Sequence, residues 1–182
     1  MANHAVFLGN KMHAQTTEAD VRPVVSSGCN IDNGNIFSLN SKYSTSGSGM
    51  EVWALTLPAT GSLINLWVAS EPEIPSAFSG TKQYRGLGTV QDFYNVANQV
   101  FTAYRLLPGD IFTLTDDGLT GSHSTGSFIV AVDGDAKWNW AAVPAASAAY
   151  AQFLNTTYFS IPDGSIGSQR TTAYQFEVKA NS

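Results

Sequence analysis

Charged residues are scarce in this chain of 182 residues, at 13% of the total against the usual quarter. Nine Lys and Arg residues against fourteen Asp and Glu residues give a formal net charge of −5. A nucleic-acid binder needs concentrated basic residues to neutralise phosphates, so this composition argues against a nucleic-acid partner. A surface with so few charges has to be covered by Ser, Thr, Asn and Gly, or by protein partners.

Cysteine and long apolar runs are also lacking. The single Cys29 excludes a disulfide framework within the chain and any cysteine-rich metal site. No apolar run approaches the ~20 residues that cross a membrane, and the N-terminus lacks the pattern of a signal peptide. We therefore expect a soluble chain that is made in a cytoplasm and has no membrane partner.

Motifs for catalysis and metal binding are missing as well. His4, His13 and His123 do not have the spacing of metal ligands. The acidic turns Asp116-Asp117 and Asp133-Gly134-Asp135 do not continue into a calcium-binding loop. We expect no enzyme activity, no metal and no cofactor. Paired carboxylates for glycoside cleavage stay open, because a sequence does not show their separation in space.

What the sequence does contain is the period-two alternation of half-buried strands. Residues 174–179 alternate apolar and polar side chains, as do residues 51–57 and 111–115. We expect an all-β fold, a sandwich or partly open barrel of about ten short antiparallel strands. The predicted core comprises Trp53, Trp67, Phe112, Leu114, Phe128, Val130, Tyr174 and Phe176.

Turn residues divide the chain into these strands. Asn33-Gly34 between apolar runs predicts a two-residue hairpin, because Asn and Gly tolerate positive φ. Residues 90–97 could form one or two turns of helix, and the Ala-rich residues 141–151 favour a helix that Pro144 restricts. The remaining predicted strands cover residues 24–26, 63–68, 100–107, 128–132, 137–142, 153–161 and 172–179.

The first 22 residues look different from the rest. They show no sustained alternation, so we expect an N-terminal arm or an edge strand over residues 1–22, rather than part of the core. The β domain is expected over residues 23–182 and could be two small lobes with a boundary near 76–98. The arm contains an apolar run that needs a cover, either from a neighbouring chain or from this chain's own sheet. Its candidate partner-binding residues are Ala5, Val6, Phe7 and Leu8.

Two tryptophans form a second candidate site. Trp138 and Trp140 are two residues apart, so they share one face of a strand. Exposed, they would make a sugar-stacking platform or an anchor between subunits; buried, they would belong to the core. A carbohydrate-binding β module is therefore an alternative function.

Several phrases together resemble a family of small tailed-bacteriophage head proteins that decorate or cement the capsid. The resemblance extends over residues 30–180, and the order of the phrases is more specific than any one of them. They are Ile31-Asp32-Asn33-Gly34-Asn35-Ile36, Glu51-Val52-Trp53, Leu66-Trp67-Val68-Ala69-Ser70, Tyr84-Arg85-Gly86-Leu87, Pro108-Gly109-Asp110-Ile111-Phe112-Thr113-Leu114 and Thr172-Ala173-Tyr174-Gln175-Phe176-Glu177-Val178.

The resemblance implies a structural protein of the virion, without a catalytic motif. It implies a place on the outer capsid surface after synthesis in the host bacterium, and the major capsid protein as partner. It also implies a homo-oligomer, for which a trimer is plausible. Head-fibre, neck and tail proteins of the virion remain alternatives.

Overall fold

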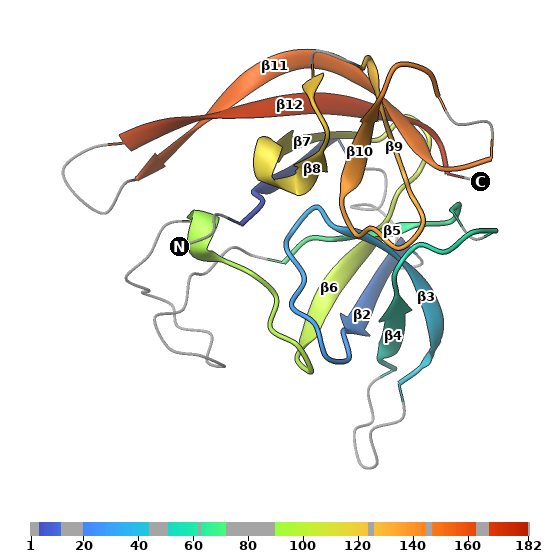
Figure 1. Ribbon diagram of the computed structural model, residues 1–182. Coiled ribbons are helices and arrows are strands. Elements are labelled where there is room, and N and C mark those ends of the chain that lie inside the picture. Colours follow the sequence, from blue (N-terminus) through green and yellow to red (C-terminus); the bar gives the residue numbers. More distant parts are fainter. Residues whose placement is uncertain are drawn as a thin grey trace.

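The computed structural model describes residues 4–11, 20–43, 51–61, 63–71, 90–123, 126–144, 147–162 and 168–181. This part of the chain is almost entirely β, so the all-β prediction is confirmed. Its twelve strands form a closed five-stranded barrel and a seven-stranded sheet that lies over one end of the barrel (Figure 1). Two strands are 13 residues long and two strand pairs are parallel, so the fold departs from short antiparallel strands in those details.

The barrel is built from strands that lie between residues 21 and 105. Its strand order is β2-β4-β3-β5-β6, and β6 pairs back to β2, so closure leaves no edge strand. Alternation places Phe101 and Ala103 inside, where both are buried. The strands are β2 (Val21–Val25), β3 (Ile36–Lys42), β4 (Trp53–Thr56), β5 (Trp67–Ala69) and β6 (Val100–Arg105).

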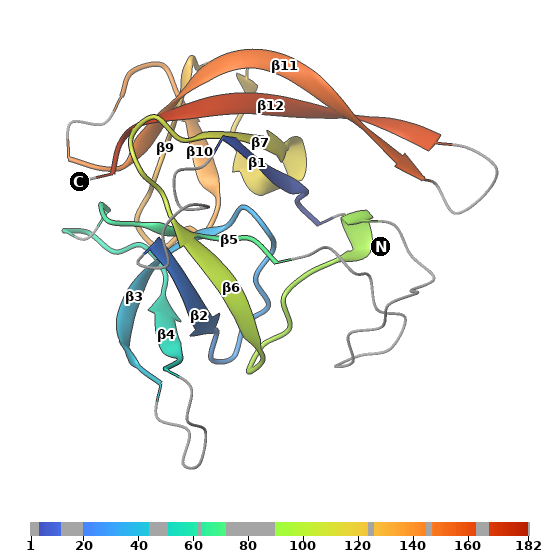
Figure 2. The same cartoon turned by 180° about the vertical axis from the view of Figure 1, so that it is seen from behind.

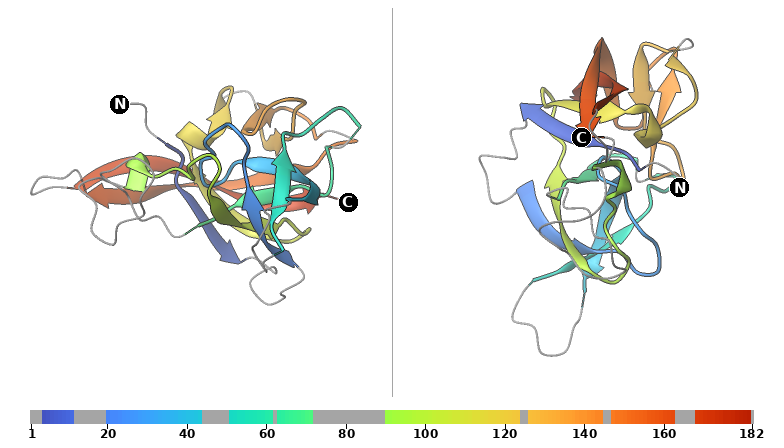
Figure 3. Two further views of the ribbon diagram at one scale, coloured as in Figure 1. Left: turned by 90° about the horizontal axis from the view of Figure 1, so that it is seen from below. Right: turned by 90° about the vertical axis from the view of Figure 1, so that its left-hand side faces the viewer.

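The seven-stranded sheet takes its strands from both ends of the chain, in the order β1-β7-β12-β11-β9-β10-β8. Its longest element is the hairpin of β11 and β12, which projects beyond the body of the molecule (Figures 1 and 3). The strands are β1 (Phe7–Lys11), β7 (Ile111–Thr115), β8 (Leu119–Thr120), β9 (Phe128–Val130), β10 (Trp138–Ala141), β11 (Tyr150–Pro162) and β12 (Ser168–Ala180), with short 3-10 turns η3 (Val90–Asp92) and η4 (Asp116–Gly118).

One hydrophobic core joins the barrel to the sheet. Phe112 lies at its centre, with ring centroids 5.6 Å from those of Phe7 and Phe176 and 6.1 Å from Trp138. Ile36, Leu66, Val68 and Leu106 enter the same cluster from the barrel half. The chain passes from barrel to sheet at residues 106–110, and residues 76–89 of the expected boundary lie outside the described part.

Asn181 adds a polar link between the two halves. Its side chain accepts a hydrogen bond from the Leu66 N–H at 2.8 Å, and its Nδ2 donates to the carbonyls of Leu66 at 2.9 Å and Leu106 at 2.7 Å. The side chain therefore bonds three backbone groups at the end of the barrel, where the Leu66 carbonyl also accepts from the Leu106 N–H at 3.3 Å.

The N-terminal residues pair with the chain's own sheet, which is one of the two alternatives from the sequence, but they also enter the core, which was not expected. Residues 7–11 belong to the sheet, because β1 is an edge strand paired antiparallel with β7, as Figure 2 shows. Residues 21 and 22 already belong to β2 of the barrel. A run of four apolar residues is too short to show its period, and its partner strand lies far along the chain. Residues 1–3 and 12–19 of the expected arm lie outside the described part.

Local predictions had mixed outcomes. The hairpin of residues 128–132 and 137–142 is confirmed by the antiparallel pairing of β9 with β10. Gly34 adopts φ +86° in a turn, but β3 pairs with β4 and β5, so the Asn33-Gly34 hairpin prediction is wrong. Of residues 90–97, only η3 is helical, and the described residues of 141–151 contain no helix.

The predicted core is confirmed in half of its positions. Trp67, Phe112, Leu114 and Phe176 are buried, whereas the other four are only partly buried: Trp53, Phe128, Val130 and Tyr174. In β9 the prediction chose the wrong face, since Ile129 between Phe128 and Val130 is the fully buried residue. A single-residue error in register exchanges the two faces of a strand.

Candidate functional site

Most of the apolar run near the N-terminus is buried inside the molecule. Ala5, Val6 and Phe7 are buried, and Ala5 and Phe7 belong to the core between sheet and barrel. The Val6 N–H donates to Thr115 Oγ1 at 2.9 Å, which adds to the pairing of β1 with β7. Leu8, which is 50% exposed, is the one predicted contact residue of this run that remains open to a partner.

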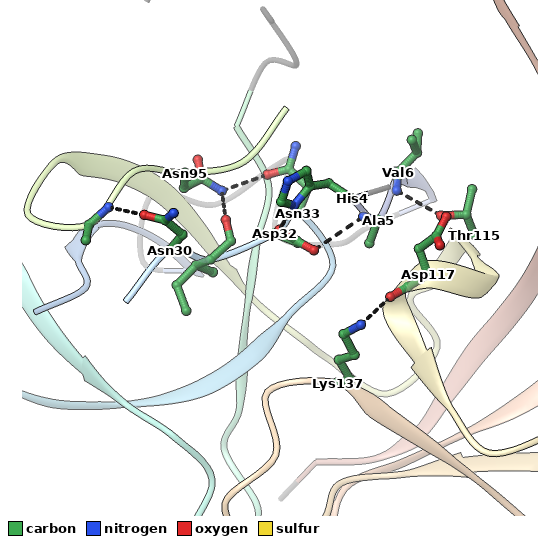
Figure 4. Close-up of polar contacts among 12 residues, drawn as sticks. His4, Ala5, Val6, Asn30, Asp32, Asn33, Asn95, Thr115, Asp117 and Lys137 are labelled. Carbon is green, nitrogen blue, oxygen red and sulfur yellow. Dashed lines mark hydrogen bonds and ion pairs between the residues drawn. The ribbon is translucent and has the colours of Figure 1, made fainter. Parts of the chain in front are cut away.

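A polar cluster fastens this N-terminal strand to both halves of the molecule (Figure 4). His4 Nδ1 lies 2.7 Å from Asp32 Oδ1, and the His4 ring packs against Tyr94 with centroids 4.7 Å apart. The His4 N–H donates to the Gln91 carbonyl at 2.8 Å. Since Asp32 precedes barrel strand β3 and His4 precedes sheet strand β1, the contact joins the two halves.

Asp117 lies on the sheet side of the same cluster. Burial raises the pKa of its carboxyl above the ordinary 3.8, the positive charge of Lys137 opposes this, and the negative charges of Asp116 and Asp32 add to it. Lys137 Nζ donates to the Asp117 backbone carbonyl at 2.7 Å, as Figure 4 shows. The cluster is therefore a structural clasp in which the ionised form of Asp117 is disfavoured.

Amide side chains connect the loops beside this clasp. Asn33 donates through Nδ2 to the Glu71 carbonyl at 2.8 Å and accepts from the Glu71 N–H at 3.1 Å, as a strand residue would. Asn95 Nδ2 donates to Asn33 Oδ1 at 3.2 Å and to the Ile31 carbonyl at 3.0 Å. These bonds satisfy buried backbone groups, so the Asn33-Gly34 turn is fixed by distant residues rather than by its own hairpin.

Trp138 and Trp140 are core residues. Trp138 is fully buried and Trp140 is 8% exposed, so neither presents a platform to a sugar ring or a partner. Trp140 packs edge-on against Tyr174 and His123, at centroid distances of 5.3 Å and 5.0 Å. His123 stacks on Tyr174 with an interplanar angle of 9°, and burial raises the pKa of the Tyr174 phenol.

Four exposed apolar side chains lie instead on loops between strands, two on a barrel loop and two on sheet loops. The Gly134 N–H donates to the Pro58 carbonyl at 2.7 Å, and the Ala149 N–H donates to the Leu63 carbonyl at 2.6 Å, so barrel loops and sheet loops meet there. We call this surface the apolar rim, defined by Leu57, Ile64, Val132 and Val143. Val143 is the most exposed of these, at 71%.

The second exposed feature is the outer part of the β11–β12 hairpin. β9 pairs with β11 only up to Gln152, and β7 pairs with β12 only from Ala173 onward. Among the described strands, residues 154–162 therefore pair only with β12 and residues 168–172 pair only with β11, and we call these two segments the ribbon. Figures 1 and 2 show it extending away from the barrel.

One feature of the sequence relates to both surfaces, although it is not a motif of particular residues. No Asp, Glu, Lys, Arg or His occurs from Trp138 to Pro162, in a chain that is otherwise acidic. This stretch supplies Val143 of the apolar rim and the outer strand of the ribbon, including Leu154 and Tyr158. Depletion of charge is typical of the centre of protein–protein interfaces.

In the described part of the chain, no three His, Cys, Asp or Glu side chains are grouped so that they could hold a metal ion. None of its helices is long and apolar enough to cross a membrane.

Comparison with protein-family models, with curated proteins and with solved structures found no match.

Proposed function

We propose that this chain is a structural protein of a bacteriophage virion that decorates the capsid and stabilises it by binding across neighbouring subunits. The observation that carries the proposal is the uncharged stretch from Trp138 to Pro162, which supplies exposed apolar side chains at the apolar rim and on the ribbon. Surfaces of this kind bury little charge on contact, so they suit attachment to other proteins.

The resemblance to phage decoration proteins supplies the specific partner, which is the major capsid protein. A protein that binds only the assembled lattice raises the cost of disassembly by mass action. The apolar rim is the surface that we assign to the capsid, because Leu57, Ile64, Val132 and Val143 lie on loops that are tied together by backbone hydrogen bonds. A surface held in this way loses little conformational entropy when it binds.

Electron cryomicroscopy of virions that contain the chain tests the assignment directly. We expect its density on the outer surface of the head, across the junctions between capsid subunits. Density confined to a head fibre, the neck or the tail would reassign the chain to that part of the virion. Absence of the chain from purified particles would contradict any virion role.

A matched pair of variants tests the assigned surface. Val143→Asp places a charge at the apolar rim, and we expect it to weaken binding to capsids at least tenfold. Val100→Asp is the control, because Val100 is similarly an exposed valine, 43% accessible, at the start of barrel strand β6. Equal capsid binding by both variants would show that the rim is not the attachment surface.

A further inference from the structure

The turn at Asn33-Gly34 contains a pair of residues that can react with each other. It is the only Asn-Gly pair in the sequence, and the Asn35 N–H closes the turn on the Asp32 carbonyl at 3.2 Å. In such a pair the glycine backbone nitrogen attacks the side-chain amide carbon of the asparagine, because no glycine side chain obstructs the approach. A succinimide ring closes and ammonia leaves, and water then opens the ring to aspartate or isoaspartate.

The fold needs both members of this pair. Gly34 adopts φ +86°, and a Cβ at this position would meet the side chains of Leu114 and Phe7, which are both buried. The Asn33 side chain donates to the Glu71 carbonyl and also accepts from the Glu71 N–H. A carboxylate has no donor, so an aspartate at position 33 could not make both bonds. Replacement of either residue would therefore remove a feature that fixes the turn.

The folded chain holds the two reacting groups apart. The Gly34 N–H, which must lose its proton in the attack, donates to the Ala69 carbonyl at 2.9 Å. The Asn33 amide is 1% exposed, is bonded to the Glu71 backbone, and accepts from Asn95 Nδ2 at 3.2 Å. The amide has to turn toward the Gly34 nitrogen to react, and this breaks its bonds to Glu71 and Asn95. The reaction therefore requires a local opening of the turn.

We propose that Asn33 is a site of spontaneous deamidation, which the folded state suppresses and which prevents a modified chain from restoring its native turn. Aspartate at this position would set a carboxylate oxygen against the Glu71 carbonyl, to which Nδ2 donates at 2.8 Å. Isoaspartate would lengthen the main chain by an atom beside the Gly34 N–H that bonds to Ala69. A reversible opening thus becomes an irreversible loss of the native state. The proposal goes beyond attachment to a capsid, since the reaction involves this chain alone.

The rate of deamidation in the full chain, measured by peptide mapping with mass spectrometry, tests the proposal. The protein is incubated at neutral pH in water enriched in heavy oxygen, either folded or in guanidinium chloride, so that the water that opens the ring labels the product. We expect Asn33 to react at least about tenfold more slowly in the folded chain than in the denatured one. Equal rates in the two states, or a denatured chain in which Asn33 is not modified, would overturn the proposal.

Asn95→Ala tests the restraint on the amide, because it removes the bonds from Asn95 to Asn33 Oδ1 and to the Ile31 carbonyl. We expect Asn33 to deamidate several-fold faster in this folded variant and at an unchanged rate in denaturant. Asn155→Ala is the matched control, since Asn155 bonds to Gln175 on the hairpin, and it should leave the rate at Asn33 as in the wild type. Circular dichroism establishes that each variant is folded. A folded Asn95→Ala chain that reacts no faster would overturn the role of Asn95.

The effect of the modification is tested by Asn33→Asp, which introduces one of the two products directly. We expect this variant to melt at a lower temperature than the wild type at pH 7, because the donor to the Glu71 carbonyl is lost. Asn155→Asp changes the net charge equally at an exposed position and should melt close to the wild type. An unchanged melting temperature for Asn33→Asp would overturn the claim that deamidation prevents return to the native turn. This comparison does not depend on the folding of Asn95→Ala.

Discussion

At the scale of single residues, the clasp around Asp117 makes the stability of the fold depend on pH. Burial raises the pKa of the Asp117 carboxyl, so the folded state holds this proton more tightly than the unfolded chain does. The free energy of unfolding therefore falls as the pH rises from the ordinary value of 3.8 through the higher folded pKa, and it remains lower above that window.

Asp117→Asn should remove this dependence. We expect the variant to melt at a higher temperature than the wild type at pH 7, with a gain below about 1 kcal/mol because the site is partly solvated. The difference should disappear at about pH 3, where both chains are neutral at this position. Asp116→Asn, at the exposed neighbouring residue, removes only a smaller cause of the raised pKa of Asp117, so we expect it to give a smaller gain at pH 7. A wild type that is the more stable protein at pH 7 would contradict the assignment.

At the scale of elements, β1 is the strand whose role differs most between sequence and structure. Phe7 is buried against Phe112, whereas Leu8, the next residue, is 50% exposed. Phe7→Ala should lower the free energy of unfolding by about 3–5 kcal/mol, and Leu8→Ala by less than about 1 kcal/mol. Denaturant titrations of the two variants give both values. Similar small losses for both would indicate that β1 does not contribute to the core.

The same strand shows what the sequence could and could not predict about the fold. Long alternation made the last strand predictable, because each residue of β12 from Tyr174 to Lys179 follows period two. The four residues Ala5–Leu8 are too few to show a period, and their partner β7 becomes adjacent only through tertiary pairing. The turn at Asn33-Gly34 is likewise decided by distant partners, Glu71 and Asn95, rather than by its flanking residues.

The candidate sites were predicted less well than the strands, for a related reason. Trp138 and Trp140 share a face, as alternation requires, but whether that face is covered depends on strands elsewhere in the chain. The absence of charge from Trp138 to Pro162 was visible in the sequence. Which part of this uncharged stretch is exposed depends on where β9 stops pairing with β11, because that point separates the buried part of β11 from the exposed ribbon.

At the scale of the whole molecule, we expect the barrel and the sheet to unfold together, and the substitution of Asn181 tests this expectation. Its side chain bonds to Leu66 and Leu106, while Ile36 and Val68 of the barrel half pack into the core around Phe112. Unfolding should therefore be a single transition, with coincident midpoints by far-ultraviolet circular dichroism and tryptophan fluorescence. Separate transitions for barrel and sheet would contradict a shared core.

Asn181→Ala leaves the Leu66 N–H and two backbone carbonyls without the side-chain partner, at a position that is 2% exposed. We expect the free energy of unfolding to fall by about 2–3 kcal/mol, because buried polar groups that lose a partner are costly. The transition should stay single, since the core around Phe112 takes residues from both halves. Asn155→Ala, which removes only an exposed contact to Gln175 on the hairpin, should cost less than about 0.5 kcal/mol. Hydrogen exchange that accelerates in β5 while β12 stays protected would show instead that Asn181 stabilises the barrel alone.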